Sequence, residues 1–248
     1  MDRRRFLQTG ALGAPAVLGV GVTTALERGA DDDGLHTRAR SGRGLGVQRI
    51  VWSGTGEGVA LTFDDGPDPE LTPRVLDALD RAGVRATFMV VGERAVATPD
   101  LVRRAVDAGH EIGNHTWSHR SLATLDPDAV RAELGRTADA LERIVPDAPV
   151  RFFRPPRGIL TGAATQAAAE LGYDVLLWSC TRTHLDRPLE PGSVACLHDG
   201  TGRSELSRWP WRHGLRAKRR AEVADLPAVL ARASRGGVRF VTASDAVR

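Results

Sequence analysis

The sequence contains little cysteine and few aromatic residues. Cys180 and Cys196 are the two cysteines among 248 residues, and aromatic residues make up 5%. Two cysteines cannot staple a small disulfide-rich module, so we expect two buried free thiols, with one disulfide as the alternative. The chain also lacks an excess of one charge, since its formal net charge is +3. So small a charge gives no electrostatic footprint for nucleic acid, and we expect no nucleic-acid partner.

Long hydrophobic runs are absent after the N-terminus. Beyond residue 25 no segment reaches the roughly 18 apolar residues of a membrane-spanning helix, so we expect no integral membrane segment in the mature chain. Residues 1–25 carry an Arg-Arg-x-Phe-Leu order at Arg3–Leu7 that resembles a twin-arginine export signal. The alternative is an anchor that stays attached, which the low hydrophobicity of the run disfavours. Residues 26–48 are polar and Gly-rich and are predicted to be a flexible linker.

Residues 49–248 alternate strand-like and helical patterns. Apolar runs predict strands at 59–63, 86–91, 111–115, 151–154, 174–179, 193–197 and 238–242. Helical patterns start at Thr72–Pro73, after Pro99 and at Asp126–Pro127, and cover 161–172 and 226–235. Such repeated units predict one α/β domain with a parallel sheet, open or closed as a seven-stranded (β/α) barrel. The link between Trp178 and Val194 shows no helical periodicity and is expected to lack a helix.

Unusual polar residues follow several of the predicted strands. They are Asp64 and Asp65 in "LTFDDGP", His115 and His119 in "HTWSH", Arg154 in "FRPPRG", and His198 in "CLHDG". In a parallel barrel the functional groups lie at the carboxyl ends of the strands, so we expect these side chains to converge on one rim. The alternative for Asp64–Pro67 alone is an ordinary turn, because Asp, Gly and Pro are turn residues.

The two histidines and the aspartate pair together suggest a metal site. His115 and His119 are four residues apart and would share one face if the stretch were helical. Two imidazoles and a carboxylate would make a three-ligand zinc site, although two surface histidines would show the same spacing. One aspartate would then bind the metal while its neighbour takes a proton from water. The spacing does not say which aspartate has which role.

Two further residues have both a functional and an ordinary interpretation. Arg154 supplies a fixed positive charge for one of the aspartates, or else belongs to a surface salt bridge. The flanking apolar residues and prolines favour a constrained, partly buried Arg154. His198 ends a buried-looking strand and is either a general acid or a core histidine with satisfied hydrogen bonds.

Taken in order, the four quoted motifs resemble those of the polysaccharide deacetylase family, the NodB homology domain of carbohydrate esterase family 4. The resemblance covers roughly residues 50–248. It implies a distorted barrel of about seven strands that removes N- or O-acetyl groups from sugar polymers with a divalent metal. The metal expected is Zn²⁺, with Co²⁺ or Ni²⁺ as alternatives. The partner expected is an N-acetylated glycan such as peptidoglycan or a chitin-like polymer, met by an exported monomer in the cell envelope or outside the cell.

The resemblance also implies a role for each site residue. Asp65, His115 and His119 would bind the metal. Asp64 would be the general base, with Arg154 orienting it. The backbone N–H of Arg157 would stabilise the oxyanion, and His198 would protonate the departing amine.

One stretch departs from the family pattern. In "LLWSCTRTHLDRP", Thr181, His184 and Leu185 stand where the family has two aspartates and a tryptophan. The first family aspartate orients the catalytic histidine, and Asp186 would replace it if the loop shifted. Two alternatives therefore stay open: a glycan-binding relative with impaired catalysis, and an amidase for a small substrate. The basic, Trp-containing segment Arg203–Arg220 is interpreted as an insertion, either a flap over the groove or a solvated loop.

Overall fold

The structure is a computed structural model that describes residues 49–185, 189–201 and 212–247. The expected export signal (1–25) and linker (26–48) lie outside the described residues and stay predictions. Within the described part of the chain, no helix combines the length and apolarity needed to cross a membrane.

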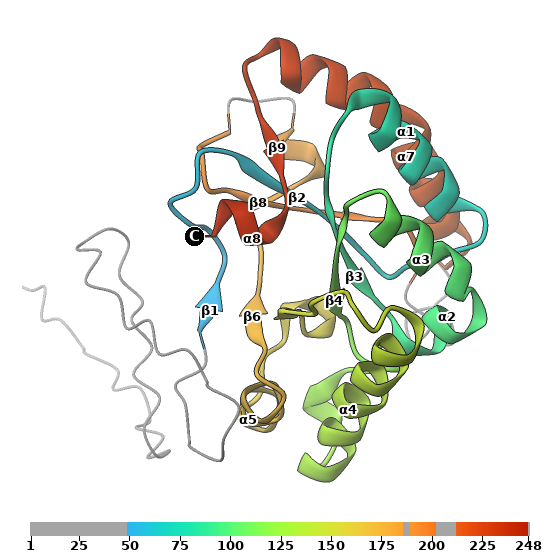
Figure 1. Cartoon of the computed structure of the whole chain (residues 1–248), viewed down its shortest axis with the longest axis vertical. Coiled ribbons are helices and arrows are strands. Elements are labelled where there is room, and N and C mark those ends of the chain that lie inside the picture. The colour runs from blue at the N-terminus through green and yellow to red at the C-terminus, as the bar shows by residue number, and fades with distance from the viewer. Residues whose placement is uncertain (1–48, 186–188, 202–211, 248) are drawn as a thin grey trace, which may run out of the picture. The chain divides into compact units, whose positions relative to one another are not determined.

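A parallel sheet forms the centre of the described domain (Figure 1). Its strands follow the order β1-β6-β5-β4-β3-β2-β8-β7, and β9 also pairs with β2. They are β1 (Ile50–Val51), β2 (Val59–Asp64), β3 (Thr87–Val90), β4 (Glu111–Asn114), β5 (Phe152–Phe153), β6 (Asp174–Leu176), β7 (Cys180–Thr181), β8 (Val194–His198) and β9 (Phe240–Val241). The α/β class and the parallel sheet are confirmed.

The predicted strand number is wrong, because the described residues contain nine strands rather than seven. All seven expected runs carry a strand. The additional strands, β1 and β7, have two residues each. Elements this short cannot show an alternation of apolar and polar residues, so no sequence pattern marks them.

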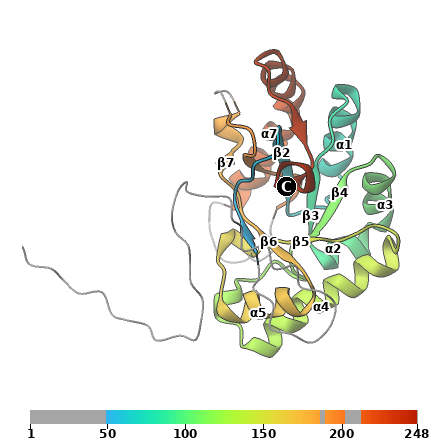
Figure 2. The ribbon, with the colours of Figure 1, turned by 60° about the vertical axis from the view of Figure 1, so that its left-hand side comes forward.

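The sheet curls because one stretch of chain joins its two sides (Figure 2). β6 pairs with β5 and β1, whereas β7, a few residues later, pairs with β8. Backbone bonds continue along the link: Leu177 N–H donates to Val51 O (2.6 Å) and Ser179 N–H donates to Val194 O (3.0 Å). The result is a distorted half-barrel in which the carboxyl ends of several strands face one rim.

Helices cover the sheet, and α1 lies beside α7 whereas α4 lies beside α2 and α5 (Figure 1). They are α1 (Leu71–Ala82), α2 (Gly92–Ala97), α3 (Pro99–Asp107), α4 (Pro127–Ile144), α5 (Gly162–Glu170), α7 (Arg212–Arg235) and α8 (Ala243–Ala246). α4 starts as its sequence predicts, since the Asp126 side chain accepts from Ala129 N–H at 2.8 Å and Pro127 is its first residue. The link after Trp178 contains β7 and only a 3₁₀ turn, Arg182–His184, among its described residues.

The predicted boundary of α7 is wrong. The last helix was predicted over 226–235, but it begins at Arg212 and contains Pro227. The loop expected over 203–220 is therefore helical from 212 onward, and 203–211 lie outside the described residues. The reason is tertiary: Arg216 and Arg220 pair with Glu70 at 2.9 and 2.7 Å, which holds this part of α7 against the chain before α1.

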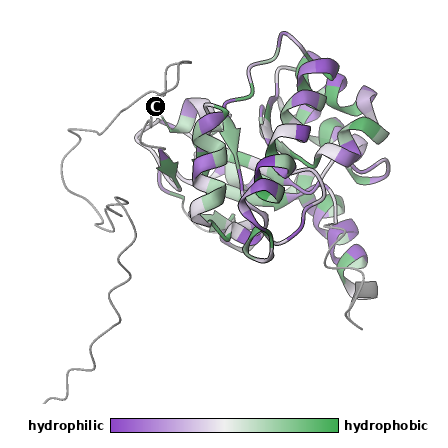
Figure 3. Ribbon diagram, turned by 90° about the horizontal axis from the view of Figure 1, so that it is seen from below, coloured by the Kyte–Doolittle hydropathy of each residue, from purple (hydrophilic) through white to green (hydrophobic). Residues whose placement is uncertain are grey.

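Apolar side chains between the helices and the sheet form the core. Val75 and Leu79 of α1 share one cluster with Val223 and Leu230 of α7 and with Phe63 of β2. The helices alternate hydrophilic and hydrophobic residues along their length (Figure 3). Burial of each large apolar side chain stabilises the fold by about 1.5–3 kcal/mol. This packing fixes β2 and β8, whose ends carry the polar residues described next.

Candidate active site

The polar residues that follow the strands come together at one rim of the sheet. Asp64 ends β2 and His198 ends β8, and the two are direct register partners. Asp65 comes next after Asp64, His115 follows β4, and the neighbouring strand β5 leads into Arg154. Asp64, Asp65, His115, His119 and Arg154 are all buried. An isolated turn, the alternative for Asp64–Pro67, does not explain this convergence.

Asp65, His115 and His119 form a compact cluster. Each offers one ligand atom, and these atoms lie within 4.8 Å of one another. Asp65 Oδ1 is 3.0 Å from His119 Nε2 and 3.6 Å from His115 Nε2. Burial would raise the pKa of Asp65, but hydrogen bonds from both imidazoles hold that pKa well below its usual range. The carboxylate is therefore charged.

The two imidazoles meet through turns and not along a helix face, so the helical interpretation of this spacing is wrong. Thr116 and His119 have positive φ angles of 67° and 56°. Thr116 N–H donates to Asn114 Oδ1 (2.9 Å), and His119 N–H donates to Thr116 Oγ1 (3.2 Å). These local bonds replace a helical turn and fold His119 back toward His115.

The donor set fits a divalent cation. His115 Nδ1 lies 2.8 Å from the Arg154 carbonyl, which can only accept, so Nδ1 carries the proton and Nε2 presents a lone pair toward Asp65. One carboxylate oxygen and two imidazole nitrogens are the ligands of catalytic zinc sites. Two adjacent buried carboxylates, Asp64 and Asp65, also require positive charge nearby. Asp65, His115 and His119 could therefore hold the metal.

A second group of possible ligands, Asp64, Cys196 and His198, fits a metal less well. Burial and then the charge of Asp64 raise the pKa of the Cys196 thiol well above its usual value. The thiol donates to Asp64 Oδ2 at 3.4 Å, and the other oxygen of that carboxylate is paired with Arg154, so the carboxylate of this group is already engaged. Cys180 pairs in register with Ala195, not Cys196, and both cysteines are free.

Arg154 holds Asp64 inside the barrel. Its side chain is 0% exposed, and Nη1 lies 2.5 Å from Asp64 Oδ1. The remaining donors reach Thr62 Oγ1 (2.8 Å), Leu176 O (2.9 Å) and Leu177 O (3.0 Å). Burial would raise the pKa of Asp64, but the guanidinium lowers it below its usual value. The surface-salt-bridge alternative for Arg154 is wrong, and Asp64 is a charged carboxylate in a fixed orientation.

Sequence reasoning missed Arg94, which braces the peptide of Asp65. Asp65 has a left-handed φ of 73°. Arg94 of α2 donates from Nη1 to Asp65 O at 2.6 Å and from Nη2 to the Thr201 carbonyl. Gly200 makes room for this contact, because a Cβ there would lie 2.2 Å from Asp65 O. The sequence around an arginine in a helix does not show whether its side chain bonds to a neighbouring loop, as Arg94 does, or lies at the surface.

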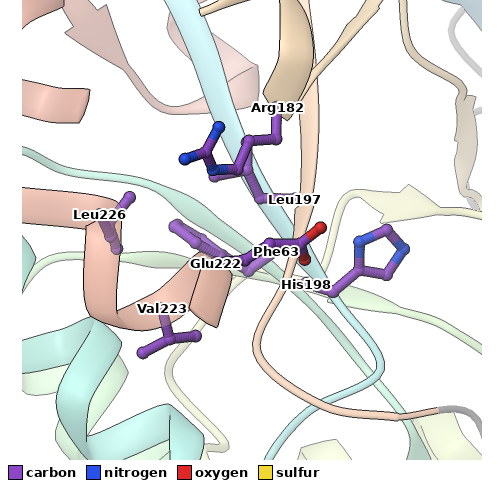
Figure 4. A pocket seen from close by; sticks show the side chains of 7 residues that line it. All are labelled: Phe63, Arg182, Leu197, His198, Glu222, Val223 and Leu226. Carbon is purple, nitrogen blue, oxygen red and sulfur yellow. The ribbon is translucent and has the colours of Figure 1, made fainter. Parts of the chain in front are cut away.

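His198 lies beside a small cavity of about 10 Å³ under α7 (Figure 4). Burial lowers the pKa of His198, the charge of Asp65 opposes this, and the charge of Arg219 adds to it. His198 is thus a buried imidazole close to the carboxylate pair. Arg157 lies in a 3₁₀ turn, Pro156–Gly158, that follows Arg154 and β5, and its φ angle is 60°.

The stretch that departs from the expected pattern supplies no carboxylate among its described residues. Thr181 Oγ1 lies 3.2 Å from His184 Nδ1, and Leu185 is buried in the core. Asp186, the expected substitute, lies outside the described residues. Any partner for His198 in the described structure must therefore come from another element.

Comparison with known proteins shows which proteins this chain resembles. A family model described as polysaccharide deacetylase matches residues 53–176. A peptidoglycan-N-acetylglucosamine deacetylase of Bacillus cereus is 44% identical over 49% of this chain and 44% of its own length. A chitooligosaccharide deacetylase of Sinorhizobium fredii is 38% identical over 65% of this chain and 81% of its own length. This chain thus spans less than half of the first relative and most of the second.

Solved structures share the fold, among them one that is 32% identical to this chain. It is a peptidoglycan N-acetylglucosamine deacetylase in complex with 4-naphthalen-1-yl-N-oxidanyl-benzamide. It matches with a TM-score of 0.67 and 32% identity, over 80% of this chain and 92% of the other.

Proposed function

This chain belongs to the polysaccharide deacetylase family, and we propose that it is an exported, metal-dependent hydrolase of N-acetyl groups on a glycan such as peptidoglycan or a chitin-like polymer. The observation that carries the proposal is the buried cluster of Asp65, His115 and His119 beside a second carboxylate, Asp64, paired with Arg154. The named activities of the two relatives support this substrate class and a hydrolase acting on a non-peptide C–N bond.

Asp65, His115 and His119 would hold the metal, which we propose to be Zn²⁺, with Co²⁺ or Ni²⁺ as substitutes. When bound, such a cation supplies a Lewis acid that polarises the acetyl carbonyl and lowers the pKa of water. The chain's contribution is to present the three ligands from two strand ends with a proton on His115 Nδ1. Burial of the cluster excludes bulk water and strengthens every charge interaction in the site.

Asp64 is the general base in this proposal. Its carboxylate is charged and accepts the proton of the attacking water while the water oxygen bonds to the acetyl carbon. Arg154 fixes Asp64 Oδ1, and the Cys196 thiol donates to Oδ2. Both contacts orient the carboxylate toward the cluster instead of letting it rotate.

The C–N bond then breaks with two other groups assisting. The backbone N–H of Arg157 would donate to the oxyanion that develops on the carbonyl oxygen, a role independent of the Arg157 side chain. His198 would transfer a proton to the departing amine as the C–N bond breaks. The products are acetate and a free amine on the sugar.

Export by the twin-arginine route is part of the proposal. It is supported by the arginine order at Arg3–Leu7 and by relatives named as peptidoglycan deacetylases, whose substrate lies in the cell envelope. The mature enzyme is proposed to be a monomer.

The test is acetate release from N-acetylglucosamine oligomers, peptidoglycan and acetylated xylan. Each substrate is assayed with enzyme that has been chelator-treated and then supplied with Zn²⁺, Co²⁺ or Ni²⁺. We expect release from an N-acetylated glycan that chelation abolishes and metal restores. Glycan binding without acetate release would instead support the impaired relative, and release only from small amides would support the small-substrate amidase.

A further inference from the structure

A carboxylate from the last long helix faces the proposed general acid. We propose that Glu222 of α7 is a positioning residue that orients His198. This inference rests on the proposed function, because it assigns His198 the task of protonating an amine. It concerns an element that none of the four sequence motifs includes.

Glu222 and His198 line the same small cavity. Glu222 and Arg182 line it together with His198, and Phe63, Leu197, Val223 and Leu226 supply its apolar wall. In Figure 4 the carboxylate of Glu222 points toward the imidazole of His198. The volume of about 10 Å³ leaves room for one water at most. The two groups line the same cavity without a direct hydrogen bond, so the contact we propose runs through a single water in this cavity.

Neighbouring charges hold Glu222 in place. Arg219 Nη1 lies 2.9 Å from Glu222 Oε2, and their side chains are 11% and 20% exposed. The arm of α7 that carries both residues is tied to Glu70 by Arg216 and Arg220. A carboxylate restrained in this way has lost much of its rotamer freedom before it meets the imidazole.

An imidazole that acts as an acid benefits from such a partner. A carboxylate that accepts from one ring N–H fixes the tautomer and the ring plane, and it stabilises the imidazolium. Burial and the charge of Arg219 lower the pKa of His198, and the charges of Asp65, Asp64 and, least of the three, Glu222 act in the opposite direction. The nearby aspartates are already engaged, Asp64 with Arg154 and Asp65 with the two histidines. Glu222 is itself paired with Arg219 through Oε2, but it is the carboxylate that lines the cavity with His198 among the described residues.

The experiment compares two substrates that differ in their need for an acid. Amine release from an N-acetylglucosamine oligomer requires protonation, whereas nitrophenolate leaves 4-nitrophenyl acetate without it. With the metal-loaded enzyme we expect Glu222→Gln to lower kcat on the oligomer about 100-fold and to change kcat on the ester less than about threefold. Glu222→Asp, which keeps the charge, should recover part of the loss on the oligomer.

Glu70→Gln is the matched control. It weakens the attachment of α7 through Arg216 and Arg220 without removing the carboxylate beside His198. We expect Glu70→Gln to lower the melting temperature slightly and to leave the ratio of oligomer to ester activity unchanged.

Several outcomes would overturn the inference. Equal losses on both substrates in Glu222→Gln would show a structural role, and unchanged oligomer activity would show no role. A shifted activity ratio in Glu70→Gln would show that helix docking and not the carboxylate matters. Wild-type enzyme that cleaves the ester but no N-acetylated oligomer would instead refute the proposed function itself, and this inference with it.

Discussion

Asp64 and Arg154 form an ion pair inside the barrel, with 2.5 Å between Oδ1 and Nη1 and with 6% and 0% of their side chains exposed. The pair joins the end of β2 to the end of β5, two strands separated in the sheet by β3 and β4. Arg154 also donates to the carbonyl of Leu176, the last residue of β6, and to that of Leu177. The Arg154 side chain therefore contacts the ends of β2 and β6 from its own place after β5, and it keeps the carboxyl group of Asp64 ionised.

Removing this arginine should destabilise the fold strongly. Arg154→Met leaves the Asp64 carboxylate buried without its cation, so we expect the free energy of unfolding to fall by about 3–5 kcal/mol. Urea unfolding of the chelated protein measures this. Arg131→Met is the control, because Arg131 pairs with Glu170 at the surface. Its substitution should lower the free energy of unfolding by less than about 1 kcal/mol. Similar losses in the two variants would contradict the buried-pair account.

Arg94→Gln should weaken metal binding more than folding. The guanidinium of Arg94 braces the left-handed peptide of Asp65, so its loss lets the ligand carboxylate move. We expect zinc affinity to drop about 10- to 100-fold, measured by competition with a coloured chelator. Arg103→Gln, which removes an exposed pair with Asp100, should leave affinity unchanged. Wild-type affinity in Arg94→Gln would show that Asp65 does not need the brace.

His110 should make the fold sensitive to acid. Its Nδ1 accepts from Ala86 N–H at 3.1 Å, so the ring is neutral. Burial, helped by Arg85, lowers its pKa from 6.5 to about 4. Between pH 6.5 and 4 the imidazole of His110 is protonated in the unfolded chain but not in the folded chain. The free energy of unfolding is therefore highest above pH 6.5 and decreases as the pH drops toward 4.

His110→Asn tests this dependence, because the amide oxygen can still accept from Ala86 N–H and does not titrate. In denaturant titrations of chelated protein, we expect the free energy of unfolding to fall by about 3 kcal/mol less in the variant than in wild type over this pH range. Parallel pH profiles for the two proteins would show that His110 is not the group responsible.

The sequence predicts the parts of this molecule whose patterns are local. Each of the seven expected strands is present, and Asp126 and Pro127 correctly mark the start of α4. Long-range contacts explain the errors. α7 extends to Arg212 because Glu70 pairs with its arginines, and β7 exists because β8 lies beside it.

The site residues also divide into those that a local sequence pattern indicates and those that only long-range packing brings to the site. Strand-end polar residues indicated Asp64, Asp65, His115 and His198 because parallel strands bring their carboxyl ends together. Arg94 and Glu222 belong to helices, where an isolated charged residue has no distinguishing pattern. Their places at the site depend on how α2 and α7 pack on the sheet, which only the folded structure shows.

The most direct test of the account is the metal content of two neighbouring variants, measured after dialysis against zinc. Asp65→Ala should retain no metal, whereas Asp64→Asn should retain about one equivalent and lose acetate release. His198→Ala should also keep its metal while turnover on the oligomer falls. Equal metal loss in Asp65→Ala and Asp64→Asn would contradict the division of roles between ligand and base, and full metal content in Asp65→Ala would refute the proposed metal centre.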